Sequence, residues 1–508
     1  MSLDWKDVIV SFSISNLFFL RVWHELIFAE PQGLFYLKTP GFSEIIALLL
    51  NVIILGIVFI GLFYILRTYQ QPSFEKLISL ILIFSFLFPL NALRLLATDL
   101  SITDIANFLG RFGAVFVVIV FIAAFTWLAI KKSKALINAV SIIYLILSPF
   151  LLVSFAQAGW ALITMEDPET QLSVESQLEK ISSAEDKGPD ERIVWFIFDE
   201  LDQRLTFEER PDDLEIPALK GLKEKGFYAT AAKAPEDETI LSMPAFLAGE
   251  KIKSATPKAI DELKLKSADA DEEFSWGDKK NIFDRVNERD GKTALSGVFL
   301  PYCRIIQDSL DFCSWQPFGT VKHNTDYGIF EAMLTQFRAP FAISPFNQRQ
   351  HAMDVHKEIY NDAVNLVKKD ELNLVLVHWS IPHYPWIYDR EQEDFSRWNY
   401  DLERGYYDNL ALVDKTIADM KAAMQEANTW DNTHLIVSSD HPWRMHLFPT
   451  YDDKYDDRIP FLVRFAGEEN KVKFEESFNT VITHDIILEI LDGEISNPEE
   501  LYEWLNKR

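Results

Sequence analysis

Three segments of the sequence carry side chains that together can hold a metal ion and activate a hydroxyl group. An apolar run ends in Asp199 and Glu200, and a later apolar run ends in Asp440 and His441. Between them, Thr239 opens the string TILSMPAFLAG. Carboxylate and imidazole groups are ligands that zinc and manganese accept. A metal bound to a hydroxyl oxygen favours the alkoxide at neutral pH. The spacing therefore predicts a metal-activated nucleophile at Thr239.

The elements around these residues indicate an α/β domain. Apolar runs alternate with amphipathic stretches from residue 192 onward. Strands are predicted at 193–198, 293–299, 372–377, 434–437 and 461–465, and helices at 355–368 and 406–427. This alternation is typical of a mostly parallel sheet covered on both faces. Chemistry in such sheets gathers at the carboxyl ends of the strands, where Asp199, His378 and Asp440 stand.

The N-terminal part of the chain predicts a membrane domain. Five apolar runs, each about long enough to cross a bilayer, lie at 8–27, 45–66, 77–96, 114–130 and 139–162, and the first is the weakest because Arg21, His24 and Glu25 interrupt it. Lys131, Lys132 and Lys134 separate the last two runs. Basic loops stay in the cytoplasm. This predicts a multi-pass protein of the plasma (inner) membrane, with a cytoplasmic N-terminus and an extracytoplasmic or periplasmic C-terminal part.

Charge separates the same two parts. The first 162 residues hold 10 Lys and Arg against 8 Asp and Glu, so the net charge of −27 arises from the remainder. An acidic exported part argues against nucleic-acid binding, which requires a basic face. We predict a transmembrane domain at 1–162, a linker or juxtamembrane helix at 163–191 and a catalytic domain at 192–508.

The two cysteines, Cys303 and Cys313, lie in the exported part. An oxidising compartment favours a local disulfide between them, with two free buried thiols as the alternative. No histidine lies close to either cysteine in the sequence, so neither is predicted to be catalytic.

The chain resembles the alkaline phosphatase/sulfatase superfamily, and within it the membrane-anchored phosphoethanolamine and phosphoglycerol transferases. The motifs that carry the resemblance are Thr239-x-x-Ser242-x-Pro244, His378-x4-His383 before a proline, and Ser439-Asp440-His441. Those transferases have five membrane spans followed by an exported catalytic domain. The resemblance covers most of the chain as architecture but only these short motifs as residues.

The resemblance assigns a role to each motif. Thr239 would be the nucleophile and a metal ligand, and Asp440 and His441 would bind the same metal. Either Asp199 or Glu200, or both, would supply the first-strand ligand. His383 would contact the substrate phosphate or a second metal, with His378 nearby. His446 and Arg444 are further candidates for the second metal or the phosphate, although each can equally be an exposed loop residue.

The implied reaction moves a phospholipid-derived phospho-head group through a covalent threonine intermediate to a glycan or lipid acceptor. The metal is expected to be zinc, with manganese or calcium as alternatives. A phosphodiesterase, phosphatase or sulfatase-like hydrolase is the alternative activity, and a scaffold that has lost catalysis is a third. Sulfatases require a Cys/Ser-x-Pro-x-Arg frame, and Phe246 stands where that arginine would be, which disfavours sulfate-ester hydrolysis.

Overall fold

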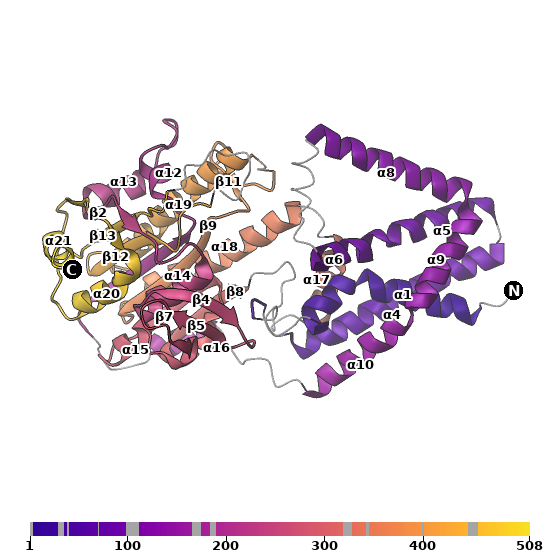
Figure 1. Ribbon diagram of the computed structural model, residues 1–508, viewed down its shortest axis with the longest axis horizontal. Coiled ribbons are helices and arrows are strands. Elements are labelled where there is room, and N and C mark those ends of the chain that lie inside the picture. The colour runs from indigo at the N-terminus through magenta and orange to yellow at the C-terminus, as the bar shows by residue number, and fades with distance from the viewer. Residues whose placement is uncertain are drawn as a thin grey trace. The chain divides into compact units, whose positions relative to one another are not determined.

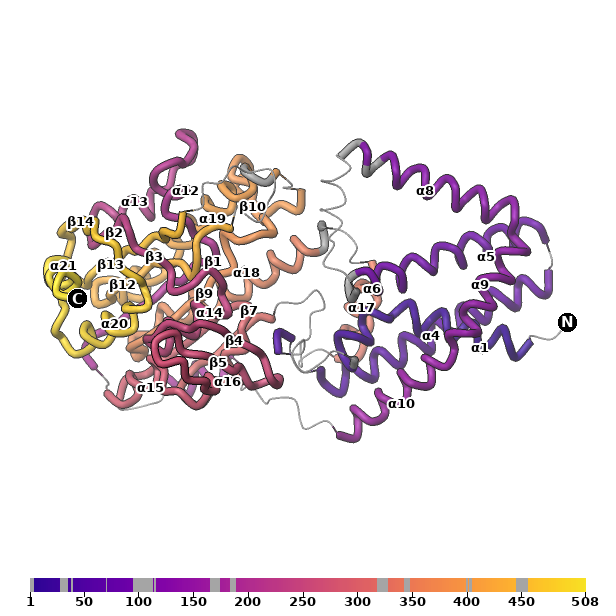
Figure 2. The backbone as a smooth tube through the Cα atoms, in the orientation of Figure 1, coloured from indigo at the N-terminus to yellow at the C-terminus, as the bar shows by residue number. Residues whose placement is uncertain are grey.

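The computed structural model describes residues 4–28, 35–37, 40–69, 71–97, 111–164, 174–182, 189–317, 328–341, 345–398, 401–444 and 456–508 (Figures 1 and 2). The chain divides into two compact units. The first contains Met1–Glu30, Leu37–Thr170 and Gly319–Pro345, and the second contains Pro31–Tyr36, Gln171–Phe318 and Phe346–Arg508. Each unit therefore includes one short segment whose sequence neighbours on both sides belong to the other unit: Gly319–Pro345 in the first and Pro31–Tyr36 in the second.

The first unit is helical. Its helices include α1 (Trp5–Phe18), α2 (Leu20–Trp23), α4 (Phe42–Tyr69), α5 (Pro72–Ser85), α6 (Leu87–Ala97), α8 (Arg111–Lys131), α9 (Ser133–Leu147), α10 (Pro149–Thr164) and α17 (Ile329–Arg338). Two helical stretches, Phe42–Tyr69 and Pro72–Arg94, are long and apolar enough to cross a membrane. A third exists if Phe116–Lys131 and Ser133–Leu147, bent by 105°, count as one span.

The five predicted spans are thus not confirmed. The run predicted as the first span is broken after Phe18, where short helical pieces follow α1. The run predicted as the fifth span is divided between α9 and α10 at Ser148. The residue after the break is Pro149, which has no backbone N–H and cannot continue the hydrogen-bond ladder of α9. Hydropathy alone does not register such breaks.

The second unit is built on an eight-stranded sheet with the order β14-β2-β13-β12-β1-β9-β7-β8. The strands are β1 (Arg192–Asp199), β2 (Phe227–Ala229), β7 (Thr293–Phe299), β8 (Phe312–Pro317), β9 (Leu374–Pro382), β12 (Thr433–Ser439), β13 (Phe461–Arg464) and β14 (Val472–Phe474). Strands β12, β1, β9, β7 and β8 pair in parallel, which confirms the mostly parallel sheet. Strand β13 is antiparallel to both of its neighbours.

Helices cover both faces of this sheet (Figure 1). Strand β1 is buried along its whole length, and its side chains alternate between two cores because successive residues point to opposite faces. Ile193, Trp195 and Ile197 join a core that includes residues of α14 (Thr239–Ala248), α15 (Ile282–Asn287), α20 (Thr483–Leu491) and α21 (Pro498–Leu505). Val194, Phe196 and Phe198 join a core with α13 (Pro217–Glu224), α18 (Pro345–Val367) and α19 (Leu402–Glu426).

Shorter elements complete the unit. These are α11 (Val174–Ser182), α12 (Gln203–Phe207), α16 (Tyr302–Ile305), the three-stranded sheet of β4 (Ile252–Pro257), β5 (Leu263–Ser267) and β6 (Glu273–Ser275), and the pairs β3 (Ala232–Lys233) with β15 (Phe478–Asn479) and β10 (Tyr388–Asp389) with β11 (Asp394–Phe395).

Candidate active site

The candidate site lies where three adjacent parallel strands end. Strand β1 lies between β12 and β9, and Phe198 is in register with Ser439 of β12. On the other side, Ile197 is in register with His378 of β9. The register therefore brings Asp199, His378 and Asp440 to one edge of the sheet, as predicted from the strand ends.

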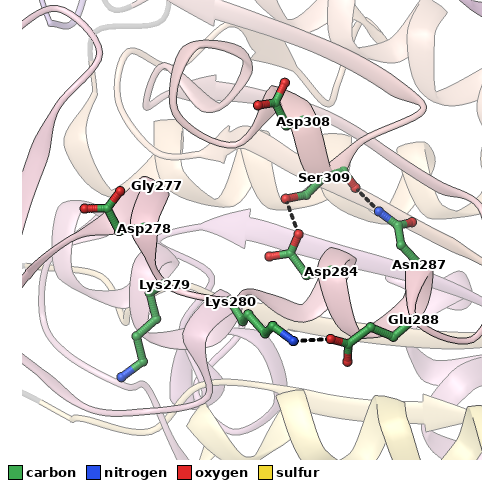
Figure 3. A pocket seen from close by; sticks show the side chains of 9 residues that line it. All are labelled: Gly277, Asp278, Lys279, Lys280, Asp284, Asn287, Glu288, Asp308 and Ser309. Atoms are coloured by element: carbon green, nitrogen blue, oxygen red, sulfur yellow. Dashed lines mark hydrogen bonds and ion pairs between the residues drawn. The ribbon is translucent and has the colours of Figure 1, made fainter.

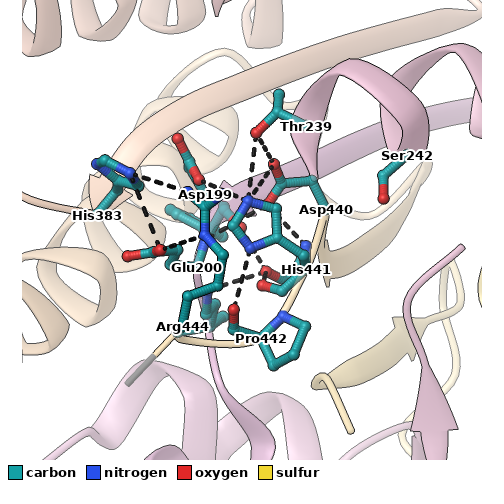
Figure 4. Close-up of polar contacts among 12 residues, drawn as sticks. Asp199, Glu200, Thr239, Ser242, His383, Asp440, His441, Pro442 and Arg444 are labelled. Carbon is teal, nitrogen blue, oxygen red and sulfur yellow. Dashed lines mark hydrogen bonds and ion pairs between the residues drawn. The ribbon is translucent and has the colours of Figure 1, made fainter. Parts of the chain in front are cut away.

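Thr239 is the first residue of helix α14, and its hydroxyl faces this edge (Figure 4). Thr239 Oγ1 donates a hydrogen bond to Asp440 Oδ2 at 2.6 Å and lies 3.3 Å from His441 Nε2. Asp440 and His441 are fully buried, and Thr239 is 8% exposed. The start of a helix carries a partial positive charge, which stabilises an anion forming there. The hydroxyl is thus placed between a proton acceptor and a positive dipole.

Ser242, on the same helix, is turned away from this group (Figure 4). Its Oγ donates to the carbonyl of Glu236 at 2.8 Å and accepts from the Glu236 N–H at 3.1 Å. Ser242 therefore closes the loop that leads into α14. Both hydrogen bonds give the hydroxyl a structural role.

Asp199 and Glu200 are neighbours in the chain but face different partners. Asp199 Oδ1 lies 3.6 Å from His441 Nε2 and has no hydrogen-bond partner among the described residues. Glu200 Oε1 instead accepts from Arg444 Nε at 3.0 Å and lies 3.9 Å from His383 Nε2. The geometry thus distinguishes the two acids, and Asp199 is the one beside Asp440 and His441.

The left-handed backbone of Glu200 (φ 65°) separates the two acids. Such a conformation is costly for a residue other than glycine and persists only when its surroundings hold it. The Glu200 N–H donates to Asp440 Oδ1 at 3.3 Å, and the hydroxyl of Tyr406 donates to the Glu200 carbonyl at 2.9 Å. Tyr406 is fully buried and stacks on Trp443. No sequence motif pointed to Tyr406, because it reads as an ordinary apolar position of α19.

Charge in the site is strongly perturbed. Burial raises the pKa of Asp199, and the neighbouring Asp440 and Glu200 raise it further. Burial opposes ionisation of Asp440 too, but His441, His378 and the Thr239 hydrogen bond outweigh it, and the pKa of Asp440 is lowered. Two carboxylates this close, buried and incompletely hydrogen-bonded, are stabilised by a bound cation.

The donor set fits a divalent metal. Asp199, His378 and Asp440 each offer a ligand atom within 4.8 Å of the others. Asp199 Oδ1 and His378 Nε2 are buried and have no hydrogen-bond partner in the described part of the chain. The resemblance to the alkaline phosphatase/sulfatase superfamily implies a divalent metal, and mixed oxygen and nitrogen donors are those of zinc or manganese sites. His378, predicted as a catalytic histidine beside His383 and not as a metal ligand, belongs to this group.

His383 and Arg444 form the outer part of the site. Arg444 Nη2 lies 3.5 Å from His383 Nε2, and both face Glu200. Burial alone would lower the pKa of His383, but Glu200 and Asp199 outweigh it and the pKa is raised. A guanidinium and an imidazole side by side can bind the oxygens of a phosphate. His446, the remaining candidate, lies outside the described residues.

An aromatic pair, Tyr36 and Phe299, was not predicted from the sequence. Tyr36 stacks on Phe299 with ring centroids 4.8 Å apart. The preceding Phe35 is fully buried in the core of the second unit. Burial and, secondarily, the charge of Glu238 raise the pKa of Tyr36. Tyr36 lies far from Phe299 in the sequence, and no sequence pattern predicted this contact.

The two cysteines form the predicted disulfide, Cys303–Cys313.

A surface hollow of about 480 Å³ lies elsewhere in the unit (Figure 3). It is lined by Gly277, Asp278, Lys279, Lys280, Asp284, Asn287, Glu288, Asp308 and Ser309. Several of these side chains form hydrogen bonds or ion pairs with one another; Ser309 Oγ, for example, donates a hydrogen bond to Asp284 Oδ1. The hollow contains no residue of the candidate site.

Comparisons with known proteins give one family match and several distant structural matches. Residues 309–492 match the family model described as Sulfatase. No curated protein matches the chain. Among solved structures, Ps i-CgsB in complex with k-i-k-neocarrahexaose is 14% identical, covering 62% of this chain and 74% of its own, with a TM-score of 0.41.

Two further structures are similarly distant. A protein in the alkaline phosphatase superfamily from Vibrio parahaemolyticus is 14% identical, covering 64% of this chain and 76% of its own, with a TM-score of 0.37. The lipoteichoic acid synthase LtaP from Listeria monocytogenes is 13% identical, covering 64% of this chain and 79% of its own, with a TM-score of 0.38. These scores carry no inference about activity. The match of residues 309–492 to the sulfatase model supports the predicted resemblance to the alkaline phosphatase/sulfatase superfamily.

Proposed function

We propose that the protein is a metal-dependent transferase that moves the phosphate-bearing head group of a membrane phospholipid to an extracytoplasmic acceptor. The head group is of the phosphoethanolamine or phosphoglycerol type, and the acceptor is a hydroxyl or amine of a glycan or lipid. One observation carries the proposal: Thr239 Oγ1 donates to Asp440 at 2.6 Å at the start of a helix, whereas Ser242 is bound within its own loop. A threonine nucleophile cannot become formylglycine, which disfavours a sulfatase.

The reaction proceeds in two balanced steps. Thr239 Oγ attacks the phosphorus of the donor and its proton passes to Asp440 Oδ2. The bond between phosphorus and the lipid glycerol oxygen breaks, and Asp440 passes that proton on to the glycerol oxygen. The acceptor then attacks the phosphothreonine and loses its own proton, which restores the Thr239 hydroxyl. A divalent metal, which we propose to be zinc, supplies Lewis-acid polarisation of the hydroxyl and the phosphate when bound by Asp199, His378, Asp440 and His441.

Arg444 and His383 complete the site by binding the phosphate oxygens that Thr239 does not attack. Arg444 is held by Glu200 and remains partly exposed, with 26% of its side chain accessible. It can therefore bind an entering phosphate without losing its carboxylate partner. A guanidinium fork and a protonated imidazole stabilise the additional negative charge of the transition state.

Membrane anchoring supports a lipid donor. The apolar N-terminal helices indicate a membrane-anchored protein. We propose that the N-terminus is cytoplasmic and the catalytic domain extracytoplasmic, because the basic residues 131–134 stay inside and the Cys303–Cys313 disulfide requires an oxidising compartment. An enzyme held at the bilayer meets its phospholipid at high local concentration.

The test is the covalent intermediate. The full chain is reconstituted in vesicles of phosphatidylethanolamine and phosphatidylglycerol, and the peptide that contains Thr239 is analysed by mass spectrometry. A phosphoethanolamine or phosphoglycerol adduct on Thr239 is expected, absent in Thr239→Ala and retained in the matched control Ser242→Ala. Bare phosphate on Thr239, formed only from simple phosphate esters, would instead establish a hydrolase. An adduct that survives in Thr239→Ala would refute the assignment of the nucleophile.

A further inference from the structure

His378 is backed by a buried tyrosine that the reaction above does not use. Tyr302 Oη and His378 Nδ1 are 2.9 Å apart, and both side chains are fully buried. The two rings meet edge to face. Gly297 of β7 makes room for the pair, since a Cβ there would lie 3.0 Å from Tyr302 Cε2 and 3.2 Å from His378 Cβ. The pair is therefore packed directly against backbone.

The surroundings of the ring fix its proton. Nε2 is buried and has no hydrogen-bond partner among the described residues, whereas Nδ1 lies 2.9 Å from Tyr302 Oη. A neutral imidazole carries a single ring proton, and the partner at Nδ1 is the place for it, with Tyr302 Oη accepting. Nε2 is left with its lone pair.

That lone pair faces the carboxylates. His378 Nε2 lies 3.8 Å from Asp440 Oδ2 and shares the three-residue group with Asp199 and Asp440. A lone pair opposite carboxylate oxygens is unfavourable unless a cation lies among them. Histidines that bind metals usually donate their second ring N–H to an oxygen atom behind them, which fixes the tautomer and the ring orientation. Tyr302 occupies that place here.

The disulfide holds Tyr302 in position. Cys303 follows Tyr302 in helix α16 and is bonded to Cys313 of strand β8. Cys313 is in register with Leu295 of β7, the strand that carries Gly297. Both cysteines are buried. The disulfide thus ties the short α16 to β8, the neighbour of the strand that carries Gly297.

We propose that Tyr302, held in place by the Cys303–Cys313 disulfide, is a positioning residue that presents His378 Nε2 to the metal, so that metal affinity depends on the Tyr302 phenol and on the disulfide. The proposal concerns the metal rather than the transferred group, and it is tested without a phosphorylated substrate. It therefore stands or fails separately from the transferase assignment.

The experiment measures zinc affinity of the full chain in detergent after metal removal, by competition with a chromophoric chelator. We expect Tyr302→Phe to weaken zinc binding by about 10–100-fold, the usual cost of removing an outer partner of a metal ligand. Tyr228→Phe is the matched control, because Tyr228 is also buried and its hydroxyl accepts from Gln203 outside the site. Binding by Tyr302→Phe within twofold of the unmodified protein, or equal losses in both variants, would overturn the proposal.

Two further measurements separate positioning from general damage. X-ray absorption at the zinc edge should show two imidazole ligands in the unmodified protein, His378 and His441, and one in His378→Ala; an unchanged count in His378→Ala would exclude His378 as a ligand. The Cys303→Ser/Cys313→Ser double variant should bind zinc more weakly, and adding Tyr302→Phe should cost less there than in the intact protein. If the double variant does not fold, the same titration on reduced protein decides, and unchanged affinity after complete reduction removes the disulfide from the proposal.

Discussion

His378 and His383 are five residues apart near the end of one strand, yet they stand in opposite electrostatic situations. His378 is fully buried and its pKa is lowered to about 4, so it is neutral. The side chain of His383 is 26% exposed, and the carboxylates of Glu200 and Asp199 raise its pKa above the ordinary value. A neutral imidazole suits a metal, and a protonated imidazole suits a phosphate.

The same division extends to their neighbours. The inner group of Asp199, Thr239, His378, Asp440 and His441 is almost entirely buried. The outer group of Glu200, His383 and Arg444 forms an ion-paired cluster that is open to solvent on one side. In the proposed mechanism the two groups have two tasks, activation of the nucleophile inside and recognition of the phosphate outside. Substitutions in the two groups should therefore produce different kinetic defects.

The largest effect is expected from the inner group. Asp440→Asn removes a buried carboxylate that accepts the Thr239 hydrogen bond and belongs to the metal group. Zinc affinity should fall by more than the roughly 10–100-fold cost of an outer-shell change, with loss of kcat. Measuring bound zinc by elemental analysis beside turnover checks this. Full metal occupancy and full activity in Asp440→Asn would show that the inner group does not bind the metal or activate the nucleophile.

Arg444→Ala should impair phosphate binding by the outer group without changing metal binding by the inner group. The guanidinium no longer binds phosphate, so kcat/KM should fall by roughly 10²-fold or more, a cost typical of losing a charge-stabilising donor, with zinc affinity unchanged within about twofold. Arg444→Lys serves as the charge-retaining control and should recover only part of the loss, because lysine lacks the planar fork. A loss of zinc affinity in Arg444→Ala would show that the outer group also contributes to metal binding.

The pH dependence should differ between the two histidines. In the metal-free protein labelled with ¹³C-histidine, NMR should show His378 titrating near pH 4 and His383 above its ordinary value of 6.5. The raised pKa of His383 contributes stability that is complete below about pH 6.5 and is lost as the pH rises through the folded-state value. The lowered pKa of His378 costs stability as the pH falls from about 6.5 towards 4.

For catalysis the corresponding expectation concerns KM. KM for the phospholipid should rise at alkaline pH as His383 loses its proton, and His383→Gln should flatten this limb of the profile. An alkaline limb that persists unchanged in His383→Gln would assign it to another group.

The smallest effect is expected at Tyr406. Tyr406→Phe removes the hydroxyl that donates to the Glu200 carbonyl and accepts the Asp202 N–H. The free energy of unfolding should fall by about 1–3 kcal/mol, because both backbone groups are left buried and unpaired. Chemical denaturation of the full chain measures the change. A matched Tyr228→Phe variant, whose hydroxyl pairs with a side chain instead, reports the generic cost of losing a buried tyrosine hydroxyl.

Much of the fold could be read from periodicity. The strands predicted at 293–299 and 434–437 coincide with or lie within β7 and β12, because a fully buried strand is apolar along its whole length. The count of membrane spans could not be read in the same way. The break at Ser148–Pro149 lies inside an apolar run, and hydropathy measures composition rather than helix continuity. The antiparallel direction of β13 also leaves no trace in its own residues.

The sequence by itself determined the chemical groups of the site, because Asp199, Thr239, Asp440 and His441 follow or open recognisable elements. Only the tertiary structure decided their division of labour. The left-handed turn at Glu200 directs one of two adjacent acids to the metal group and the other to Arg444. Tyr302 reaches His378 from a segment far away in the chain. Sequence records residue types and local spacing, whereas burial and long-range neighbours, which set charge and hydrogen bonding, arise only when the chain folds.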